Sequence, residues 1–469
     1  MPPTTHRRLE LPRPTRLQRA GLVIGVVAFL LPLTFDVPGL GPEGERMLAI
    51  FLLAIVLWIT EAIPLVATAV LVILLQVLTI SDQAIVPVGD DSLAAASYFA
   101  TLADPVIVLF LGGFLIAEGA ARFGLDRNLA AVLLRPFSRG PRSVVLGLMA
   151  ITALLSMFVS NTATTATMFA VVVPVLAALP PGTARTGVAL AIPIAANVGG
   201  IGTPVGSPPN AIALGALSAR GEAVSFVGWM LLAVPLMLVV LALAWWVITR
   251  RYVPAGTPVS LELTPDFATT SAAWVFYAIA GGTIALWLTE PLHGLASSTV
   301  GFLAVVALLG TQVLGADDLR KLQWHVLWLV AGGIALGAGI GATGLDEWLL
   351  GLVTWELLPT LALVALLAAT GLALSTVISS SAAANLLIPL ALGLASGVAI
   401  DPTLLGVVVA IACALAMALP ISTPPNAIAY ATGEIPTGAM ATTGLTIGLI
   451  GATLLVVAMP PLWTALGLL

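Results

Sequence analysis

Charged residues are scarce in this sequence. Of its 469 residues, 8% are Asp, Glu, Lys or Arg, while 59% are hydrophobic. A soluble domain carries about 25% charged residues, because its surface faces water. The apolar residues come in runs long enough to cross ~30 Å of hydrocarbon as helices of ~20 residues. The composition therefore excludes an ordinary soluble protein and predicts an all-α polytopic protein of the cell membrane, surrounded by the lipid bilayer.

Cysteine and histidine are scarce as well. Cys413 is the single cysteine, which excludes an internal disulfide, and three histidines beside it supply no metal-ligand cluster. A membrane-embedded enzyme would need a nucleophile–base pair or a metal cluster. The sequence shows neither of these, no ATP-binding motif, and nothing that suggests a nucleic-acid partner. These absences favour a secondary transporter over an enzyme or a primary pump.

Three stretches of the first half of the chain recur in the same order in the second half. They are WITE (58–61) and WLTE (287–290), LFLGGFLIAEGAARFGLD (109–126) and LVAGGIALGAGIGATGLD (329–346), and SPPNAIA (207–213) and TPPNAIA (423–429). Such matches indicate a duplicated chain with repeats at 45–250 and 271–469. The glycine pairs at 112–113 and 332–333 within these stretches predict close helix packing.

The two repeats differ in charge at equivalent places. Residues 121–143 contain five arginines, whereas residues 341–363 contain no Lys or Arg and three acidic residues. Short cytoplasmic loops collect Lys and Arg. We therefore expect 121–143 inside and 341–363 outside, so that the repeats have inverted topology, as in many secondary transporters. By the same rule, residues 1–44 form a basic cytoplasmic N-terminus and the first transmembrane helix, and 251–270 form a cytoplasmic linker.

Each repeat contains an apolar segment that small polar residues interrupt. In 144–175 the interruption is Ser-Asn-Thr at 160–162, and in 360–390 it is three serines at 379–381. About sixteen residues on each side give helices of ~24 Å. We therefore expect two re-entrant helix hairpins with their tips near the midplane. Backbone amides at a helix N-terminus there would present partial positive charge to an anion.

A second interruption in each repeat is rich in glycine or proline, and it predicts broken helices at 197–213 and 417–429. Broken backbone at membrane depth is tolerated only where it is buried in protein or lines a cavity. Paired interruptions in both repeats therefore point to a transporter's binding site. The four interrupted segments contain no Asp or Glu, which disfavours an ion/proton antiporter, because antiporters need a membrane-buried acid.

A few isolated polar residues stand in apolar surroundings. Glu118 and His325 are candidates for a proton relay. Glu118 also lies within two turns of Arg122, which favours a place at the membrane interface instead. Glu61 and Glu290 end the repeated Trp-x-Thr-Glu motif, where structural anchoring is favoured over a role in transport.

These motifs resemble the divalent anion/sodium symporter family, which carries dicarboxylates, citrate or sulfate. The resemblance rests on SNT at 160–162, LFLGGFLIA at 109–117 and the paired SPPN and TPPN, and it covers nearly the whole chain. It implies a homodimer in which a scaffold domain holds a transport domain that moves as an elevator. It also implies secondary active transport of a small divalent anion, such as succinate or sulfate, coupled to sodium.

The resemblance further implies roles for residues of the four interrupted segments. The residues expected to bind the substrate are Asn161, Thr162, Ser207, Ser380, Ser381 and Thr423. The first sodium site would consist of Ser156, Ser160, Asn161 and the carbonyl of Gly206, and the second of Ser375, Ser380 and the carbonyls of Ile378 and Ser422.

The second hairpin tip departs from the family pattern, because Ser380 stands where the family has asparagine. Asparagine would offer an amide oxygen to sodium and an NH₂ group to the substrate, whereas serine offers one hydroxyl. Asn385 lies more than a helical turn further along the chain, so it cannot be assumed to replace the asparagine that is missing at position 380. The departure puts the second sodium site and a dicarboxylate substrate in question. Sodium-independent anion exchange within the same family is therefore the main alternative.

Overall fold

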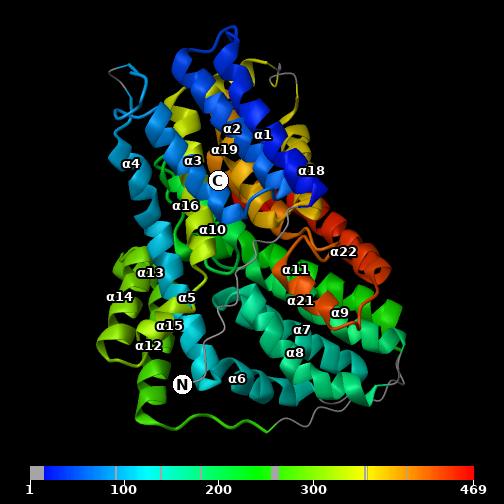
Figure 1. Ribbon diagram of the computed structural model, residues 1–469. Coiled ribbons are helices and arrows are strands. Elements are labelled where there is room, and N and C mark those ends of the chain that lie inside the picture. The colour runs from blue at the N-terminus through cyan, green and yellow to red at the C-terminus, as the bar shows by residue number, and fades with distance from the viewer. Residues whose placement is uncertain are drawn as a thin grey trace, which may run out of the picture.

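The computed structural model describes residues 15–89, 92–137, 140–179, 182–254, 264–352, 355, 358–398 and 400–468. Every regular element within these ranges is a helix (Figure 1). Nine helical stretches among the described residues are long and apolar enough to cross a membrane. The predicted all-α polytopic fold is therefore confirmed. Residues 1–14 and 255–263, which belong to the predicted cytoplasmic N-terminus and linker, lie outside the described ranges.

Eleven α-helices form the first part of the chain. They are α1 (Arg16–Thr34), α2 (Pro42–Thr60), α3 (Leu65–Thr79), α4 (Ala95–Ala100), α5 (Pro105–Phe123), α6 (Leu125–Leu134), α7 (Pro141–Phe158), α8 (Asn161–Ala178), α9 (Thr183–Gly200), α10 (Pro208–Ser218) and α11 (Phe226–Tyr252). Two short 3₁₀ helices, η1 (Thr101–Ala103) and η2 (Arg135–Phe137), follow α4 and α6.

Twelve more α-helices follow the linker. They are α12 (Ser271–Leu288), α13 (Glu290–His293), α14 (Ser297–Gly310), α15 (Ala316–Arg320), α16 (Trp324–Ala342), α17 (Leu345–Gly351), α18 (Thr360–Val377), α19 (Ser380–Gly397), α20 (Pro402–Ala414), α21 (Pro424–Ala431), α22 (Thr437–Val457) and α23 (Met459–Ala465).

The repeated sequence motifs build the same local structures in both repeats. The Trp58 indole N–H donates to the carbonyl of Leu65, the first residue of α3, at 3.2 Å. The Trp287 indole N–H donates to the carbonyl of Ser297, the first residue of α14, at 2.9 Å. Each Trp-x-Thr-Glu motif thus ties one helix to the start of the next. The two copies of the motif therefore make the same kind of contact.

The first glycine of each Gly-Gly pair allows two backbones to touch, as predicted. A Cβ added at Gly112 on α5 would lie 2.5 Å from the carbonyl oxygen of Gly301 on α14. A Cβ added at Gly332 on α16 would lie 2.5 Å from the Cβ of Ala69 on α3. Helix α5 of the first repeat therefore packs on α14 of the second, and α16 of the second packs on α3 of the first. The segments that the sequence assigns to different repeats are thus in direct contact.

The hairpins bend where the sequence predicts, and their arms are slightly longer than expected. Residues 159–160 separate α7 from α8, residues 378–379 separate α18 from α19, and each of the four arms has 18 residues. In Figure 1, α7 and α8 lie in the lower part of the molecule and α18 and α19 in the upper part, with α10 between them. The two hairpins thus approach the middle from opposite ends.

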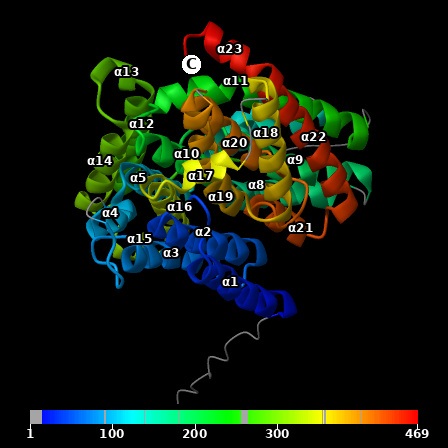
Figure 2. The same ribbon diagram turned by 90° about the horizontal axis from the view of Figure 1, so that it is seen from above.

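Burial separates inner helices from outer ones. Residues 187–200 of α9 are all buried, whereas only 17% of the apolar window of α1 and 28% of that of α12 are buried. Seen from above, α1 and α23 lie at opposite edges and α10 and α20 lie in the interior (Figure 2). The exposed apolar faces of the outer helices are suited to contact lipid. The broken helices therefore lie inside protein, as their unpaired backbone groups require.

Candidate functional site

Both hairpin tips and both proline loops meet at one cavity of about 180 Å³. This volume equals the share of liquid that about six water molecules occupy. Its lining residues are Leu65, Phe110, Phe114, Ser160, Asn161, Thr162, Asn197, Val205, Gly206, Ser207, Pro208, Gln323, His325, Val326, Leu329, Ser379, Ser380, Ser381, Ala414, Thr423, Pro424 and Pro425. All six residues predicted to bind substrate are among them.

Each hairpin tip is capped by its own first serine. The Ser160 hydroxyl accepts a hydrogen bond from the N–H of Ala163 at 3.2 Å, and the Ser379 hydroxyl accepts one from Ala382 at 3.2 Å. Serine is a preferred N-cap because its oxygen satisfies a donor that has no carbonyl one turn back. The caps leave the N–H groups of Asn161 and Thr162 at the start of α8 beside the cavity.

The proline loops are shorter than the predicted segments, because helical structure extends into both. The first break covers only 201–207, between α9 and α10, and the second covers 415–423, between α20 and α21. The asparagine of each Pro-Pro-Asn motif satisfies the carbonyls that the break frees. Asn210 donates to the carbonyls of Gly200 at 2.9 Å and Thr203 at 2.8 Å. Asn426 donates to those of Met417 at 2.9 Å and Leu419 at 3.0 Å, so both motifs brace their loops in the same way.

The loops of the two repeats are also joined to each other. The Asn197 side chain, which is buried near the end of α9, donates to the Asn426 side-chain oxygen at 2.9 Å. Asn197 lines the cavity, and its role was missed at the sequence level. The only signal was a polar residue inside an otherwise apolar and glycine-rich run.

Several oxygen atoms of the first repeat surround one end of the Asn161 side-chain amide. Ser156 Oγ contacts this end and donates to the Ala196 carbonyl at 2.9 Å. The same end lies 3.0 Å from the Gly206 carbonyl oxygen and 3.2 Å from that of Ala196. Gly200 leaves the space, because a Cβ there would lie 2.4 Å from the amide. An inward amide nitrogen can donate to these oxygens, whereas an inward amide oxygen can accept from the Ser156 hydroxyl but faces the two carbonyl oxygens without a donor.

The equivalent groups of the second repeat already have partners. The Ser375 hydroxyl donates to the Cys413 carbonyl at 2.7 Å. The backbone N–H of Ser380 donates to the Ser422 carbonyl at 3.2 Å, and the Ser422 hydroxyl donates to the Thr376 carbonyl at 2.9 Å. Two of the predicted ligand groups of the second sodium site, the Ser375 hydroxyl and the Ser422 carbonyl, are therefore engaged in protein hydrogen bonds. Of the other two, Ser380 lines the cavity and Ile378 lies in the extended break before Ser379.

Asn385 does not take the place of the missing asparagine. It lies fully buried on α19, away from the cavity lining, and its amide nitrogen donates to the Leu329 carbonyl at 3.0 Å. Its side-chain oxygen has no hydrogen-bond partner among the described residues. A Cβ added at Gly333 would lie 1.9 Å from that oxygen, so the second glycine of the pair makes room for Asn385.

Four further lining residues were not predicted as site residues. Phe110 and Phe114 of α5 form an apolar wall, with their rings edge to face at 5.6 Å between centroids. Gln323 reaches the first hairpin tip, and its amide nitrogen donates to Ser160 Oγ at 2.8 Å. His325 also lines the cavity, so it is near the site rather than in a separate relay.

Glu118, the other relay candidate, lies outside the cavity lining. Its carboxylate pairs with the Lys321 amine at 3.1 Å, and the same amine lies 3.3 Å from Asp318, which also pairs with Arg122. Hydrogen bonds to Glu118 and Asp318 raise the pKa of Lys321. Glu118 therefore belongs to an ion-pair cluster at a helix end, in agreement with the interface reading.

The repeated glutamates have structural contacts. Glu290 accepts a hydrogen bond from the backbone N–H of Phe226 at 2.8 Å, at the start of α11. Glu61 has a φ of 45° at the end of α2, and its carbonyl accepts from the Gln18 side chain at 3.1 Å. The Glu290 carboxylate thus has the anchoring role that was predicted, whereas the contact of Glu61 is made by its backbone.

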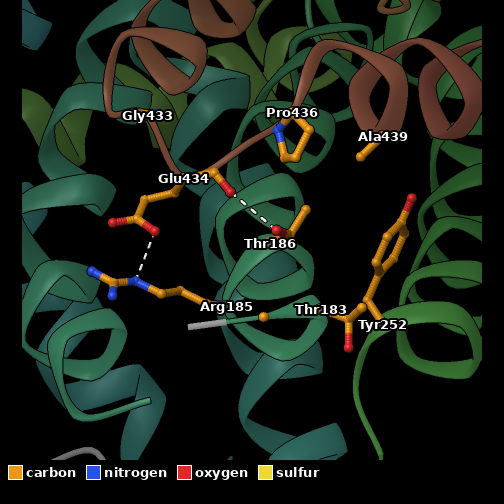
Figure 3. A pocket seen from close by; sticks show the side chains of 9 residues that line it. Thr183, Arg185, Thr186, Tyr252, Gly433, Glu434, Pro436 and Ala439 are labelled. Atoms are coloured by element: carbon orange, nitrogen blue, oxygen red, sulfur yellow. Dashed lines mark hydrogen bonds and ion pairs between the residues drawn. The ribbon is translucent and has the colours of Figure 1, made fainter. Parts of the chain in front are cut away.

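A second hollow, of about 480 Å³, lies between the start of α9, the end of α11 and the loop before α22 (Figure 3). Its charged groups face one another, because Arg185 Nε lies 2.7 Å from Glu434 Oε2. Thr186 donates to the Glu434 carbonyl at 3.1 Å. None of the predicted site residues lines this hollow, and its paired charges neutralise each other. The smaller cavity at the hairpin tips is therefore the candidate site.

Two solved structures share this fold. The YdaH transporter of Alcanivorax borkumensis superposes with a TM-score of 0.56 at 16% sequence identity, over 91% of this chain and 99% of that one. MtrF of Neisseria gonorrhoeae superposes with a TM-score of 0.55 at 12% identity, over 96% of this chain and 95% of that one. At these identities the likeness concerns the fold alone.

Sequence comparisons identify the family. A model described as Citrate transporter matches residues 55–412. Two proteins named sodium-dependent dicarboxylate transporter SdcS, from Staphylococcus saprophyticus and Staphylococcus aureus, are 31% and 30% identical, each over 94% of this chain and 90% of their own length. The chain is thus a multi-pass membrane transporter and not an enzyme. It belongs to the citrate transporter family, within the divalent anion/sodium symporters that its motifs resemble.

Proposed function

We propose that this protein is a secondary active transporter that carries a small dicarboxylate across the cell membrane in symport with sodium. The observation that carries the proposal is the single cavity at which both hairpin tips and both proline loops meet. The names of the SdcS relatives support the dicarboxylate and the sodium. Sodium-independent anion exchange stays the alternative, because the second hairpin tip is less suited to a cation, as described below.

The cavity recognises an anion through neutral groups. The N–H groups of Asn161 and Thr162 stand at the positive end of the α8 dipole, and that of Ser381 stands in the first turn of α19, at its positive end. The Thr423 hydroxyl is buried and has no hydrogen-bond partner in the described part of the chain, so it is ready for a ligand. No lysine or arginine is among the lining residues. Each tip is suited to one carboxylate of a dicarboxylate.

Sodium fits the group of oxygens around Asn161. With the Asn161 amide oxygen turned inward, a cation between it, Ser156 Oγ and the Gly206 carbonyl would relieve the repulsion of these oxygens. Turning the amide by 180° satisfies the same oxygens without an ion. Asn161 therefore links cation binding to the anion that it also contacts. This linkage is the property that symport requires.

The second repeat is less suited to a cation. The carbonyl of Ser422 already accepts a hydrogen bond from the Ser380 N–H, and Ser380 offers no amide oxygen. We infer that one sodium site, at Asn161, couples transport, and that the second is weak or absent. If the first site also proved dispensable, the protein would be an anion exchanger.

The movement that we propose is an elevator in a homodimer with inverted repeats. The hairpin α7–α8 lies in the lower part of the molecule and α18–α19 in the upper part (Figure 1), and both tips line the cavity. A substrate held between the tips then has one hairpin toward each side of the membrane. Small displacements of the tips and proline loops relative to the helices around them would expose the site to one side at a time.

The experiment is uptake of labelled succinate, citrate and sulfate into proteoliposomes, with an inward sodium gradient and with potassium in its place. We expect sodium-driven accumulation of a dicarboxylate. Asn161→Ala should abolish accumulation while membrane insertion survives, because Ser156 and the Gly206 carbonyl lose their shared partner at ~1–3 kcal/mol. Exchange without a sodium requirement would favour the alternative, and no uptake or exchange of any of the three anions would reject the proposal.

A further inference from the structure

The first turn of α16 forms a wall of the cavity that neither hairpin tip provides. His325, Val326 and Leu329 lie on one face of this helix and line the cavity. Gln323, at the N-cap position, fastens the wall to the first tip through its 2.8 Å hydrogen bond to Ser160. The α16 wall, meaning residues 323–329, therefore lies beside the substrate position that the tips define.

His325 is the one ionisable side chain among the lining residues of the described chain. It is exposed, and no described residue forms a hydrogen bond or ion pair with its imidazole. His293 is different, because its Nε2 lies 2.8 Å from the Leu286 carbonyl and its Nδ1 accepts from the Leu295 N–H at 3.0 Å. His293 has a structural task in the turn after α12, whereas the imidazole of His325 is available to a ligand.

Few other charges face the beginning of α16. The neighbouring elements α3, α10, α19 and η1 carry no charged residue. Neighbouring α5 carries Glu118 and Arg122, and both are engaged in the ion-pair cluster with Lys321 and Asp318. Helix α15, just before α16, carries Asp317 and Arg320, which pair with each other at 2.8 Å, and Asp104 caps the start of α5. Other charges lie toward the far end of α16, which contacts Met47 of α2 and leads into α17. These are Glu43, Glu45, Arg46, Asp346 and Glu347.

We propose that His325 is a specificity residue that contacts a carboxylate beyond the two that the hairpin tips hold, and so favours citrate and other tricarboxylates. This inference rests on the proposed function. The tips supply two anion-binding helix ends, and the α16 wall lines the same cavity and carries its one ionisable side chain, available to a third carboxylate. Imidazole carries a positive charge in the mildly acidic range, where a charge-assisted hydrogen bond to a carboxylate forms.

The test compares two substrates in His325→Gln, with His293→Gln as the matched control. The KM for succinate and the inhibition of succinate uptake by citrate are measured in proteoliposomes at about pH 6 and about pH 8. We expect His325→Gln to weaken citrate inhibition about tenfold at the lower pH while the succinate KM changes less than about twofold. The control should leave both values unchanged. Substrate protonation at each pH is the same for every variant. A difference between variants in the ratio of citrate inhibition to succinate KM therefore reports the protein alone.

A fixed charge separates recognition from a packing effect. His325→Lys should keep citrate inhibition and make the ratio of citrate to succinate affinity independent of pH between these values. Equal weakening of succinate and citrate in His325→Gln, or no change in either, would overturn the inference. A wild-type protein that transports succinate but is not inhibited by citrate would overturn it too, and in that case the proposed function survives. Failure of the wild type to move any anion would instead reject the proposed function itself.

Discussion

Asn161 and Ser380 occupy equivalent positions at the starts of α8 and α19, but their surroundings differ. The Asn161 side chain reaches the Gly206 carbonyl, whereas in the second repeat the backbone N–H of Ser380 itself bonds to the equivalent carbonyl of Ser422. One shorter side chain thus lets the tip close onto its proline loop. The Ser422 carbonyl, which would face a cation there, is already engaged by this hydrogen bond.

Restoring the asparagine tests this explanation. We expect sodium-dependent uptake by the wild type to follow a Hill coefficient of about one, and Ser380→Asn to make it steeper. The new amide oxygen would stand beside Ser375 and Ser422, as Asn161 stands beside Ser156 and Gly206. Uptake is measured against sodium concentration for both proteins. Asn385→Ala is the control and should leave the coefficient unchanged, and a wild-type coefficient clearly above one would show that the second site is intact.

Gly200 offers a second test at this scale. A Cβ at this position would lie 2.4 Å from the Asn161 amide, so Gly200→Ala should push the amide from its place. We expect succinate uptake to fall on the order of tenfold or more, because small displacements of binding groups have large kinetic effects. Gly281→Ala, on α12 with no atom within 4 Å of the added Cβ, is the matched control. Normal uptake by a well-inserted Gly200→Ala protein would contradict the position assigned to Asn161.

The two proline loops are similar in structure, but side-chain hydrogen bonds hold them unequally. Both asparagines of the Pro-Pro-Asn motifs donate to loop carbonyls, but only Asn426 also accepts a hydrogen bond, from Asn197. The Asn210 side-chain oxygen has no partner in the described part of the chain, and Cys413 occupies the position equivalent to Asn197. The second loop is therefore the more firmly held of the two.

This difference predicts an order of stability. Asn426→Ala should lower the thermal unfolding temperature in detergent more than Asn210→Ala, because it frees the Met417 and Leu419 carbonyls and also strands Asn197. Each unpaired buried group costs ~1–3 kcal/mol. Thr446→Ala, at an exposed position of α22, is the control with little expected change. Equal or reversed shifts for the two asparagine variants would show that the Asn197 contact contributes nothing.

The elements of the site could be located from the sequence, but their contacts could not. Interruptions by serine, glycine and proline mark helix breaks through local backbone chemistry, so both tips and both loops were found in the sequence, and Ser160 and Ser379 are recognisable N-caps. Gln323 meets Ser160 across 163 residues, and Asn197 meets Asn426 across 229. Those contacts depend on how the repeats pack, which no local pattern records.

The whole molecule is organised by the exchange of helices between its repeats. Helix α5 packs on α14 and α16 packs on α3, so neither repeat forms a separate core. The binding cavity lies where the exchange brings both tips together. Inversion of one repeat relative to the other stays a prediction. It would place equivalent ends of the helices of the two repeats on opposite sides of the membrane.

Two long-range contacts bear on that prediction. The Trp348 indole on α17 donates to the Pro38 carbonyl at 3.0 Å, so the acidic stretch shares a side with the loop after α1, at the opposite end of α1 from Arg16 and Arg19. Asn128 on α6 exchanges two 2.8 Å hydrogen bonds with the backbone of Asp266, so the arginine-rich stretch shares a side with the linker. Both pairings agree with the charge distribution, which places Lys and Arg inside.

Labelling of single cysteines decides the topology. Arg127 and Glu347 are exposed and equivalent, since each follows the aspartate of its Gly-Leu-Asp motif. We introduce Arg127→Cys and Glu347→Cys separately into a Cys413→Ala background, which removes the one native thiol, itself buried. An impermeant thiol reagent added to intact cells should label the cysteine at 347 and spare the one at 127 until the membrane is permeabilised. The motif is the same in both repeats, so labelling of both positions from one side would mean that the repeats are parallel, and the inverted arrangement would be wrong.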